Sequence, residues 1–143
     1  MIETGGPAPD FTLSDQDGQS VTLSALRGRN VVLYFYPKAD TPGCTKQACG
    51  VRDHSADYEQ ANAVVLGISK DPVDDLRKFA DKYGLPFTLL SDEGNAIKDE
   101  YGAGKRSTVI VDPEGNVAEV FPSVQPEEHD DLVLGSLRQA IEG

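Results

Sequence analysis

Six consecutive apolar and aromatic residues, Val31–Tyr36, constrain the fold of this chain more than any other segment. A strand that faces water on one side alternates apolar with polar residues, so an uninterrupted run predicts a strand covered on both faces. A second run of this kind follows at 64–69. Because a helical pattern separates the two runs, they indicate central strands of a sheet that lies between helices.

The rest of the chain completes an α/β pattern. Turn-forming residues between short alternating stretches predict two hairpins, at 11–23 and 109–121, and a short strand is expected at 87–90. The helices are expected from about Pro42 to Asn62, from Pro72 to a stop at Gly84, over 95–101, and from about Pro126 onward. We therefore predict one domain over 1–143, an α/β three-layer sandwich with a mixed central sheet and an N-terminal β-hairpin extension.

The composition argues against several classes of partner. The 143 residues include 13 basic and 24 acidic side chains, a net charge of −11, without a Lys/Arg-rich run that would suit nucleic acid or an anionic membrane. No stretch reaches the roughly 20 apolar residues of a membrane span, and the first residues lack the features of a signal peptide. We expect a cytoplasmic protein whose 2 cysteines serve redox chemistry or metal binding.

Both cysteines lie just after the first apolar run. Thr41 is a favourable N-cap residue and Pro42 suits the first helical position, which makes Cys44 the third residue of a helix. Its amide would lack an intrahelical partner, and the helix dipole favours an anion there, so the sequence predicts an activated thiol. Full ionisation of a free thiol gains only about 30-fold at neutral pH. Larger accelerations need donors aimed at the substrate, for which Thr41 and Arg106 are the candidates.

Cys49 follows Cys44 on the same predicted helix. This spacing separates the Cα atoms by roughly 8.6 Å on an ideal helix, whereas disulfides rarely tolerate more than about 7 Å. A bond between the two sulfurs would therefore require local unwinding, and Gly43 and Gly50 would each lower its cost by roughly 1 kcal/mol. We predict that the helix unfolds locally when the two cysteines are oxidised.

Simpler interpretations of these residues stay open at this point. Cys49 could be an inert small apolar residue, Thr41 only a helix cap, and Arg106 an ordinary surface cation. Arg52 could belong to a solvated helix face, or it could support Arg106 or the thiolate.

A metal site is a weaker interpretation of the cysteines. Together with His54 and His129 they superficially offer four zinc ligands, but the spacing matches no usual zinc signature. Ligands spread around one helix also do not converge. We expect no metal and no other cofactor, and both histidines at the surface.

The segment Y-P-K-A-D-T-P-G-C-T, followed by Cys49, resembles the active site of peroxiredoxins of the bacterioferritin-comigratory, or Q-type, subgroup. The likeness continues at 7–11, 67–69, 89–92 and 106–108, and so covers almost the whole chain. It implies a thioredoxin-like fold and a peroxidase that reduces hydrogen peroxide and organic hydroperoxides. It also implies that Cys44 is the peroxidatic cysteine, oxidised to a sulfenic acid.

The resemblance implies a role for each remaining site residue. Thr41 and Arg106 would bind the peroxide with the help of the Gly43 amide, and Pro37 would shield the sulfur from water. Cys49 would form an intramolecular disulfide, which thioredoxin or a similar dithiol would reduce. Because both cysteines lie on one helix, a monomer would suffice.

Two features depart from the family pattern: the loop at 102–105 is shorter than in many members, and the chain has no Trp. The main alternative function is a thiol-disulfide oxidoreductase or redox sensor without peroxide turnover. Such proteins usually carry C-x-x-C, whereas the spacing here is C-x-x-x-x-C. A holdase or interaction domain is a third possibility, without an evident apolar patch to support it.

Overall fold

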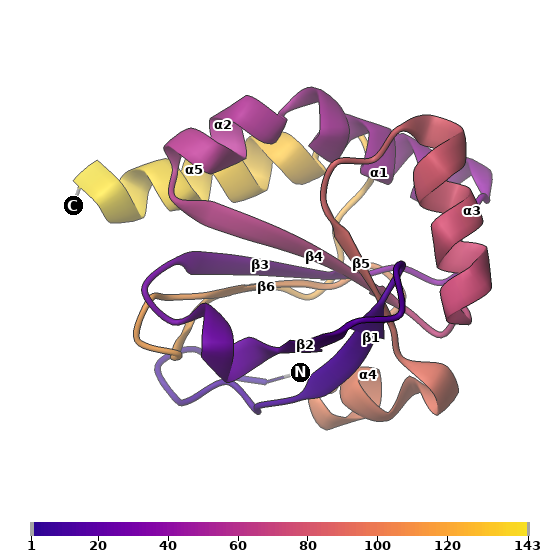
Figure 1. Cartoon of the computed structure of the whole chain (residues 1–143). Coiled ribbons are helices and arrows are strands. Elements are labelled where there is room, and N and C mark those ends of the chain that lie inside the picture. The colour runs from indigo at the N-terminus through magenta and orange to yellow at the C-terminus, as the bar shows by residue number, and fades with distance from the viewer. Residues whose placement is uncertain (1, 143) are drawn as a thin grey trace.

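The computed structural model describes residues 2–142 and contains a seven-stranded mixed sheet in the order β2-β1-β5-β4-β3-β6-β7 (Figure 1). The central strands β3, β4 and β5 pair in parallel, and the remaining pairs are antiparallel. The two continuous apolar runs are thus the two central strands, as predicted. The strands are β1 Thr12–Asp15, β2 Ser20–Thr22, β3 Asn30–Phe35, β4 Ala63–Ser69, β5 Thr88–Ser91, β6 Thr108–Val111 and β7 Val117–Phe121.

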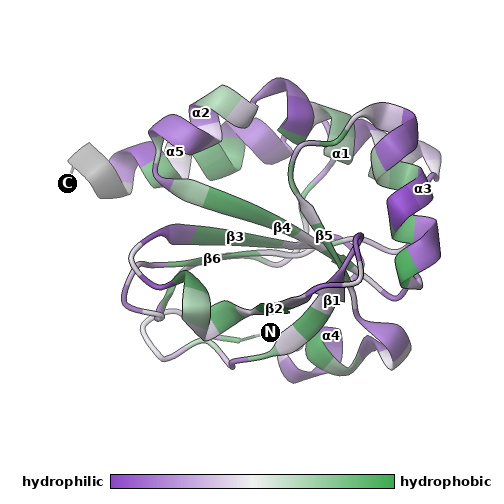
Figure 2. Ribbon diagram, in the orientation of Figure 1, coloured by the Kyte–Doolittle hydropathy of each residue, from purple (hydrophilic) through white to green (hydrophobic). Residues whose placement is uncertain are grey.

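Helices cover both faces of the sheet, which confirms the predicted three layers. The upper face in Figure 1 carries α1 Pro42–Asp53, α2 Ser55–Gln60, α3 Val73–Tyr83 and α5 His129–Glu142. The lower face carries α4 Ala96–Glu100 and two short 3-10 turns, η1 Leu23–Leu26 and η2 Glu93–Asn95. Figure 2 shows apolar residues along the central strands, whereas hydrophilic and hydrophobic residues alternate along the helices.

The buried core is divided by the sheet. Successive side chains of β3 point to opposite faces, so Val32 and Tyr34 pack beneath the upper helices, while Leu33 and Phe35 pack against the lower layer. Cys44 belongs to the upper cluster. The site helix α1 therefore rests on the face of the sheet that carries most of the helices.

Two helix predictions were wrong at their boundaries. The helix expected over 42–62 is two helices, because His54 leaves helical geometry with φ −104° and ψ 17°. The last helix begins at His129, since 126–128 form a turn that closes from Glu128 N–H to Gln125 O at 3.0 Å. The stop at Gly84 is confirmed by its left-handed conformation, φ 60°.

The surface position expected for His129 was also wrong. Its side chain is fully buried and its ring packs edge-on against Tyr34, with centroids 5.5 Å apart. Its Nε2 lies 3.1 Å from Thr108 Oγ1. A polar ring is tolerated there because β6 supplies this partner.

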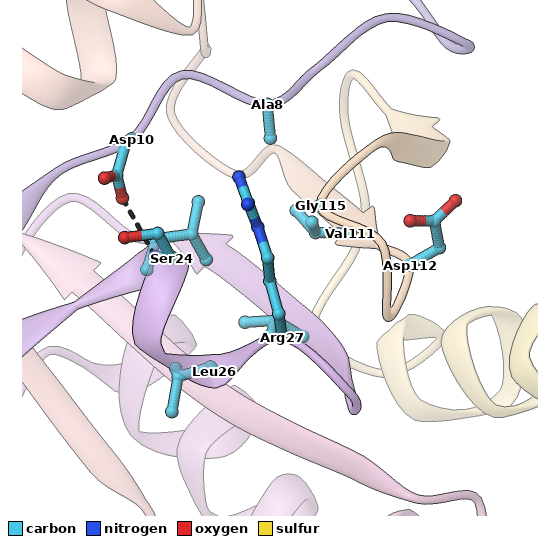
Figure 3. A pocket seen from close by; sticks show the side chains of 10 residues that line it. Ala8, Asp10, Ser24, Leu26, Arg27, Val111, Asp112 and Gly115 are labelled. Carbon is cyan, nitrogen blue, oxygen red and sulfur yellow. Dashed lines mark hydrogen bonds between the residues drawn. The ribbon is translucent and has the colours of Figure 1, made fainter.

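A small cavity lies at the end of the sheet where β3 begins (Figure 3). At the edge of this cavity, the Asp10 carboxylate accepts a hydrogen bond from Ser24 N–H at 2.9 Å. Arg27 extends past Gly115 on the other side of the cavity opening. Its volume of about 20 Å³ admits little more than one water molecule. Because Cys44 follows the other end of β3, this cavity is separate from the cysteine site.

Candidate active site

Cys44 is the third residue of α1, as the sequence predicted. Thr41 occupies the N-cap position with extended backbone angles, φ −98° and ψ 155°, and Pro42 is the first helical residue. The Cys44 side chain is 1% exposed and its thiol is free. The sulfur is therefore shielded from bulk water at the start of a helix.

Two neighbouring tyrosines belong to the same buried cluster as Cys44. The rings of Tyr34 and Tyr36 lie 5.5 Å apart, and the Tyr34 hydroxyl has no hydrogen-bond partner among the side chains of residues 2–139. Burial raises the pKa of both phenols, and a negative charge at Cys44 would raise them further. Both rings therefore stay neutral in the physiological range.

Thr41 does not cap the helix with its side chain, contrary to the simpler expectation. Its hydroxyl instead donates to the Lys38 carbonyl at 2.8 Å. The chain turns back between these residues because Asp40 adopts a left-handed conformation, φ 60°. Because this bond uses its only hydrogen, the Thr41 hydroxyl offers lone pairs as an acceptor, and the expectation that it would be a donor to the substrate was wrong.

Arg106 reaches the first turn of α1 from the start of β6. Its Nη1 donates to Gln47 Oε1 at 3.3 Å. A Cβ atom on Gly43 would overlap Arg106 Nη2 and would lie 3.2 Å from Cζ. Only glycine at position 43 leaves room for this guanidinium, so the structure brings Gly43 and Arg106 together beside Cys44.

The main chain around Arg106 is held on both sides. The Arg106 carbonyl accepts from Val124 N–H at 3.0 Å, and the Ser107 carbonyl accepts from Phe35 N–H at 2.8 Å. The Ser107 hydroxyl also accepts from Gly104 N–H at 2.7 Å, which closes the short loop before Arg106. Arg106 is thereby anchored next to the end of β3, where the segment leading to Cys44 departs.

Gln47 lies at the candidate site beside Arg106, although no sequence motif singled it out. Its side chain is 1% exposed, and its Nε2 has no partner in the described part of the chain. The signal was its spacing: Gln47 follows Gly43 by one helical turn and so shares a helix face with it. A buried amide on that face needs a polar neighbour, which Arg106 provides.

Cys49 is half-buried on the uninterrupted helix α1, and its thiol is also free. Arg52 lies near it, but its hydrogen bonds go elsewhere: Nη1 donates to the Tyr83 carbonyl at 2.7 Å and Nε to Asp53 at 3.0 Å. The hydrogen-bonded ion pair with Asp53 raises the Arg52 pKa most, and a negative charge on the nearby Cys49 thiol raises this pKa further. Arg52 thus links α1 to α3 rather than supporting Arg106.

The end of α1 rests on a buried carboxylate. A Cβ atom on Gly50 would lie 2.5 Å from Asp130 Oδ2, and Asp130 Oδ1 accepts from the Tyr58 hydroxyl at 2.6 Å. His54 Nδ1 lies 2.9 Å from the Gly50 carbonyl and 3.5 Å from Asp130 Oδ2. The hydrogen bond with the Gly50 carbonyl is the main cause that raises the His54 pKa, and the charge of Asp130 raises it further.

The four residues considered as zinc ligands do not form a metal site, and no three His, Cys, Asp or Glu side chains gather as ligands would among residues 2–139, whose side chains the structure describes. None of the helices in the described range is long and apolar enough to cross a bilayer. Pro37 is half-buried in the segment between β3 and α1.

The mixed sheet and a cysteine at the start of the helix after its central strand define a thiol oxidoreductase of the thioredoxin fold. Residues 4–120 match the AhpC/TSA family. A Coxiella burnetii protein named as a peroxiredoxin bcp is 46% identical over 149 residues, which cover 95% of this chain and 99% of that protein. The chain belongs to the AhpC/TSA family, within which it is a peroxiredoxin of the bcp/Q type.

Solved structures agree with this assignment. Peroxidoxin BcpB from Mycobacterium tuberculosis superposes with a TM-score of 0.92 at 37% identity, covering 97% of this chain and 98% of that one. The bacterioferritin comigratory protein of Xanthomonas campestris, described with alkyl peroxide reduction activity, superposes with a TM-score of 0.91 at 31% identity. The superposition covers 96% of this chain and 99% of that one. These likenesses extend along nearly the full length of both partners.

Proposed function

We propose that Cys44 carries the thiol peroxidase reaction. Its thiolate attacks the terminal oxygen of a hydroperoxide, the O–O bond breaks, and the sulfur becomes a sulfenic acid. The other oxygen takes a proton and leaves as water or an alcohol. Sulfur is oxidised by two electrons and the peroxide is reduced by two, so this step needs no metal or cofactor.

The position of Arg106 at the first turn of α1 is the observation that carries this proposal. A guanidinium beside Gly43 stabilises negative charge on the sulfur and on the departing oxygen. The Thr41 hydroxyl donates its hydrogen to the Lys38 carbonyl, so its oxygen accepts a hydrogen bond from the O–H of the incoming peroxide. The free amides of Gly43 and Cys44 add further donors, and Pro37 restricts water.

Cys49 resolves the sulfenic acid. Its thiol attacks the Cys44 sulfur, a disulfide forms, and the hydroxyl leaves as water. Because α1 is intact in the structure, its middle must unwind first, which strains the contacts of Gly50 with Asp130 and of Arg52 with Tyr83. A thioredoxin-like dithiol then restores both thiols, and one subunit suffices.

Rapid mixing with hydrogen peroxide tests the proposal. The chain has no Trp, so quenched samples are best followed by mass spectrometry of Cys44. Thr41→Val and Arg106→Ala should each slow oxidation by more than the about 30-fold that ionisation alone supplies. Oxidation of the wild type at the rate of a free thiol would favour a thiol-disulfide oxidoreductase or redox sensor.

The two cysteine variants separate the steps. Cys44→Ser should abolish the fast reaction with peroxide. Cys49→Ser should leave that reaction fast and block recycling by thioredoxin. Full recycling of Cys49→Ser by thioredoxin would show that another thiol resolves the sulfenic acid.

A further inference from the structure

Asp71 is a buried carboxylate just beyond the end of β4. It is 5% exposed, and none of the ion pairs among the side chains of residues 2–139 includes it. Its Oδ2 accepts from the Ala39 amide and from the Ser69 hydroxyl, both at 2.7 Å. Its own carbonyl accepts from the Ser91 hydroxyl, also at 2.7 Å, so β5 fixes its backbone.

The Ala39 amide lies in the segment 37–41, which joins β3 to α1 and carries Pro37 and Thr41. This segment is not regular structure, and the residue after Ala39, Asp40, is held at φ 60°, in the left-handed region that few residues other than glycine adopt. The segment therefore needs contacts from outside to keep its shape.

In the described part of the chain, such contacts are made at Asp40 and at Ala39, and they differ in strength. The Asp40 side chain meets the Tyr83 hydroxyl at 2.7 Å and Lys82 Nζ at 2.9 Å, but this contact is exposed to solvent. The Ala39–Asp71 hydrogen bond ends on a buried side-chain oxygen, where solvent competes little and a lost partner costs more. Asp71 is accordingly the stronger anchor.

We propose that Asp71 is a positioning residue of the peroxidase reaction, which holds the Thr41 hydroxyl and Pro37 in place through the Ala39 amide. This inference rests on the proposed function of Cys44. Asp71 touches neither substrate nor sulfur, and it acts by fixing the backbone two residues before Thr41. Its loss should therefore impair activation of the peroxide more than reactivity of the thiol.

Asp92 offers a matched control. It too is a buried carboxylate beyond a strand end, and it accepts from two backbone amides, of Ile97 at 3.1 Å and of Lys98 at 3.0 Å. These amides belong to α4, on the face of the sheet opposite to α1 (Figure 1). Asp92→Ala thus removes a similar buried anchor away from the segment before Cys44.

The test compares two reagents on the full chain. For the wild type, Asp71→Ala, Asp71→Asn and Asp92→Ala, the rate constants of Cys44 with hydrogen peroxide and with iodoacetamide are measured by mass spectrometry. Asp71→Ala should lower the peroxide rate by about 10- to 100-fold and change alkylation far less. Asp71→Asn should recover most of the peroxide rate because its amide oxygen can still accept from Ala39.

Asp71→Ser replaces Asp71→Ala if the alanine variant does not fold, since serine is polar but too short to reach the Ala39 amide. A peroxide-to-iodoacetamide ratio equal to those of the wild type and Asp92→Ala would overturn the role of Asp71. If Cys44 of the wild type is oxidised by peroxide no faster than a free thiol, this result would instead refute the proposed function, and this inference with it.

Discussion

Gly43→Ala is the most direct test of the Arg106 arrangement. The added Cβ would overlap Arg106 Nη2 and lie 3.2 Å from Cζ. Heavy atoms in favourable contact stand about 3.5–4.0 Å apart, so Cζ would retreat by roughly 0.3–0.8 Å and the overlapping Nη2 by roughly 1 Å. Because the guanidinium ends a flexible side chain, this retreat should cost little folding stability.

The expected cost is in the rate. A displacement of about 1 Å lowers a reaction rate by about 10²-fold, which corresponds to about 2.7 kcal/mol in the activation free energy. We expect Gly43→Ala to slow oxidation of Cys44 by hydrogen peroxide by 10- to about 100-fold. The melting temperature should change by no more than a few degrees.

The assay is rapid mixing with peroxide, quenching and mass spectrometry of Cys44. Gly135→Ala in α5 is the matched control, because a Cβ there meets no atom of the described chain within 4 Å. In an Arg106→Ala background, Gly43→Ala should cost almost nothing, since both changes remove the same interaction. Full activity of Gly43→Ala, or an undiminished cost without Arg106, would refute the reasoning.

Three further predictions follow from contacts along α1. Gln47→Leu removes the acceptor of Arg106 and should slow peroxide reduction by about tenfold, whereas Gln47→Glu should stay close to wild type; equal rates for both would contradict this role. Arg52→Ala removes the bond to the Tyr83 carbonyl, so amide exchange over 44–53 and formation of the disulfide should accelerate while the first oxidation is unchanged, and unchanged exchange would count against it. The Gly50 carbonyl raises the His54 pKa, so protonated His54 stabilises the folded state. This contribution to the free energy of unfolding is complete below the unfolded pKa of about 6.5, and it is lost as pH rises through the folded pKa. Urea unfolding should therefore separate His54→Gln from wild type at pH about 5.5 more than at pH about 8.5, and a pH-independent difference would exclude this linkage.

Local sequence signals predicted the elements well where a few adjacent residues decide the structure. The runs that became β3 and β4 could hardly lie anywhere but the centre of the sheet, because an apolar strand must be covered on both faces. Thr41 and Pro42 place Cys44 at the third helical position, and Gly84 ends α3, since these preferences act within one turn.

Predictions failed where a distant partner overrides the local preference. Thr41 is a residue type that often caps helices with its side chain, yet its hydroxyl donates to the Lys38 carbonyl because the segment before α1 turns back. His129 appeared polar enough for the surface, but Tyr34 and Thr108 enclose it. The break at His54 arises where its own ring approaches the Gly50 carbonyl beside Asp130.

By itself, the sequence determined the layers of the sandwich and a cysteine at a helix start, since periodicity and capping involve only near neighbours. Tertiary structure alone decided which groups surround that cysteine. Arg106 reaches Gly43 and Gln47 because β6 pairs with β3, and Asp71 reaches Ala39 because β4 pairs with β3 on its other side. Contacts between residues so far apart in the chain depend on strand pairing, which no local pattern encodes.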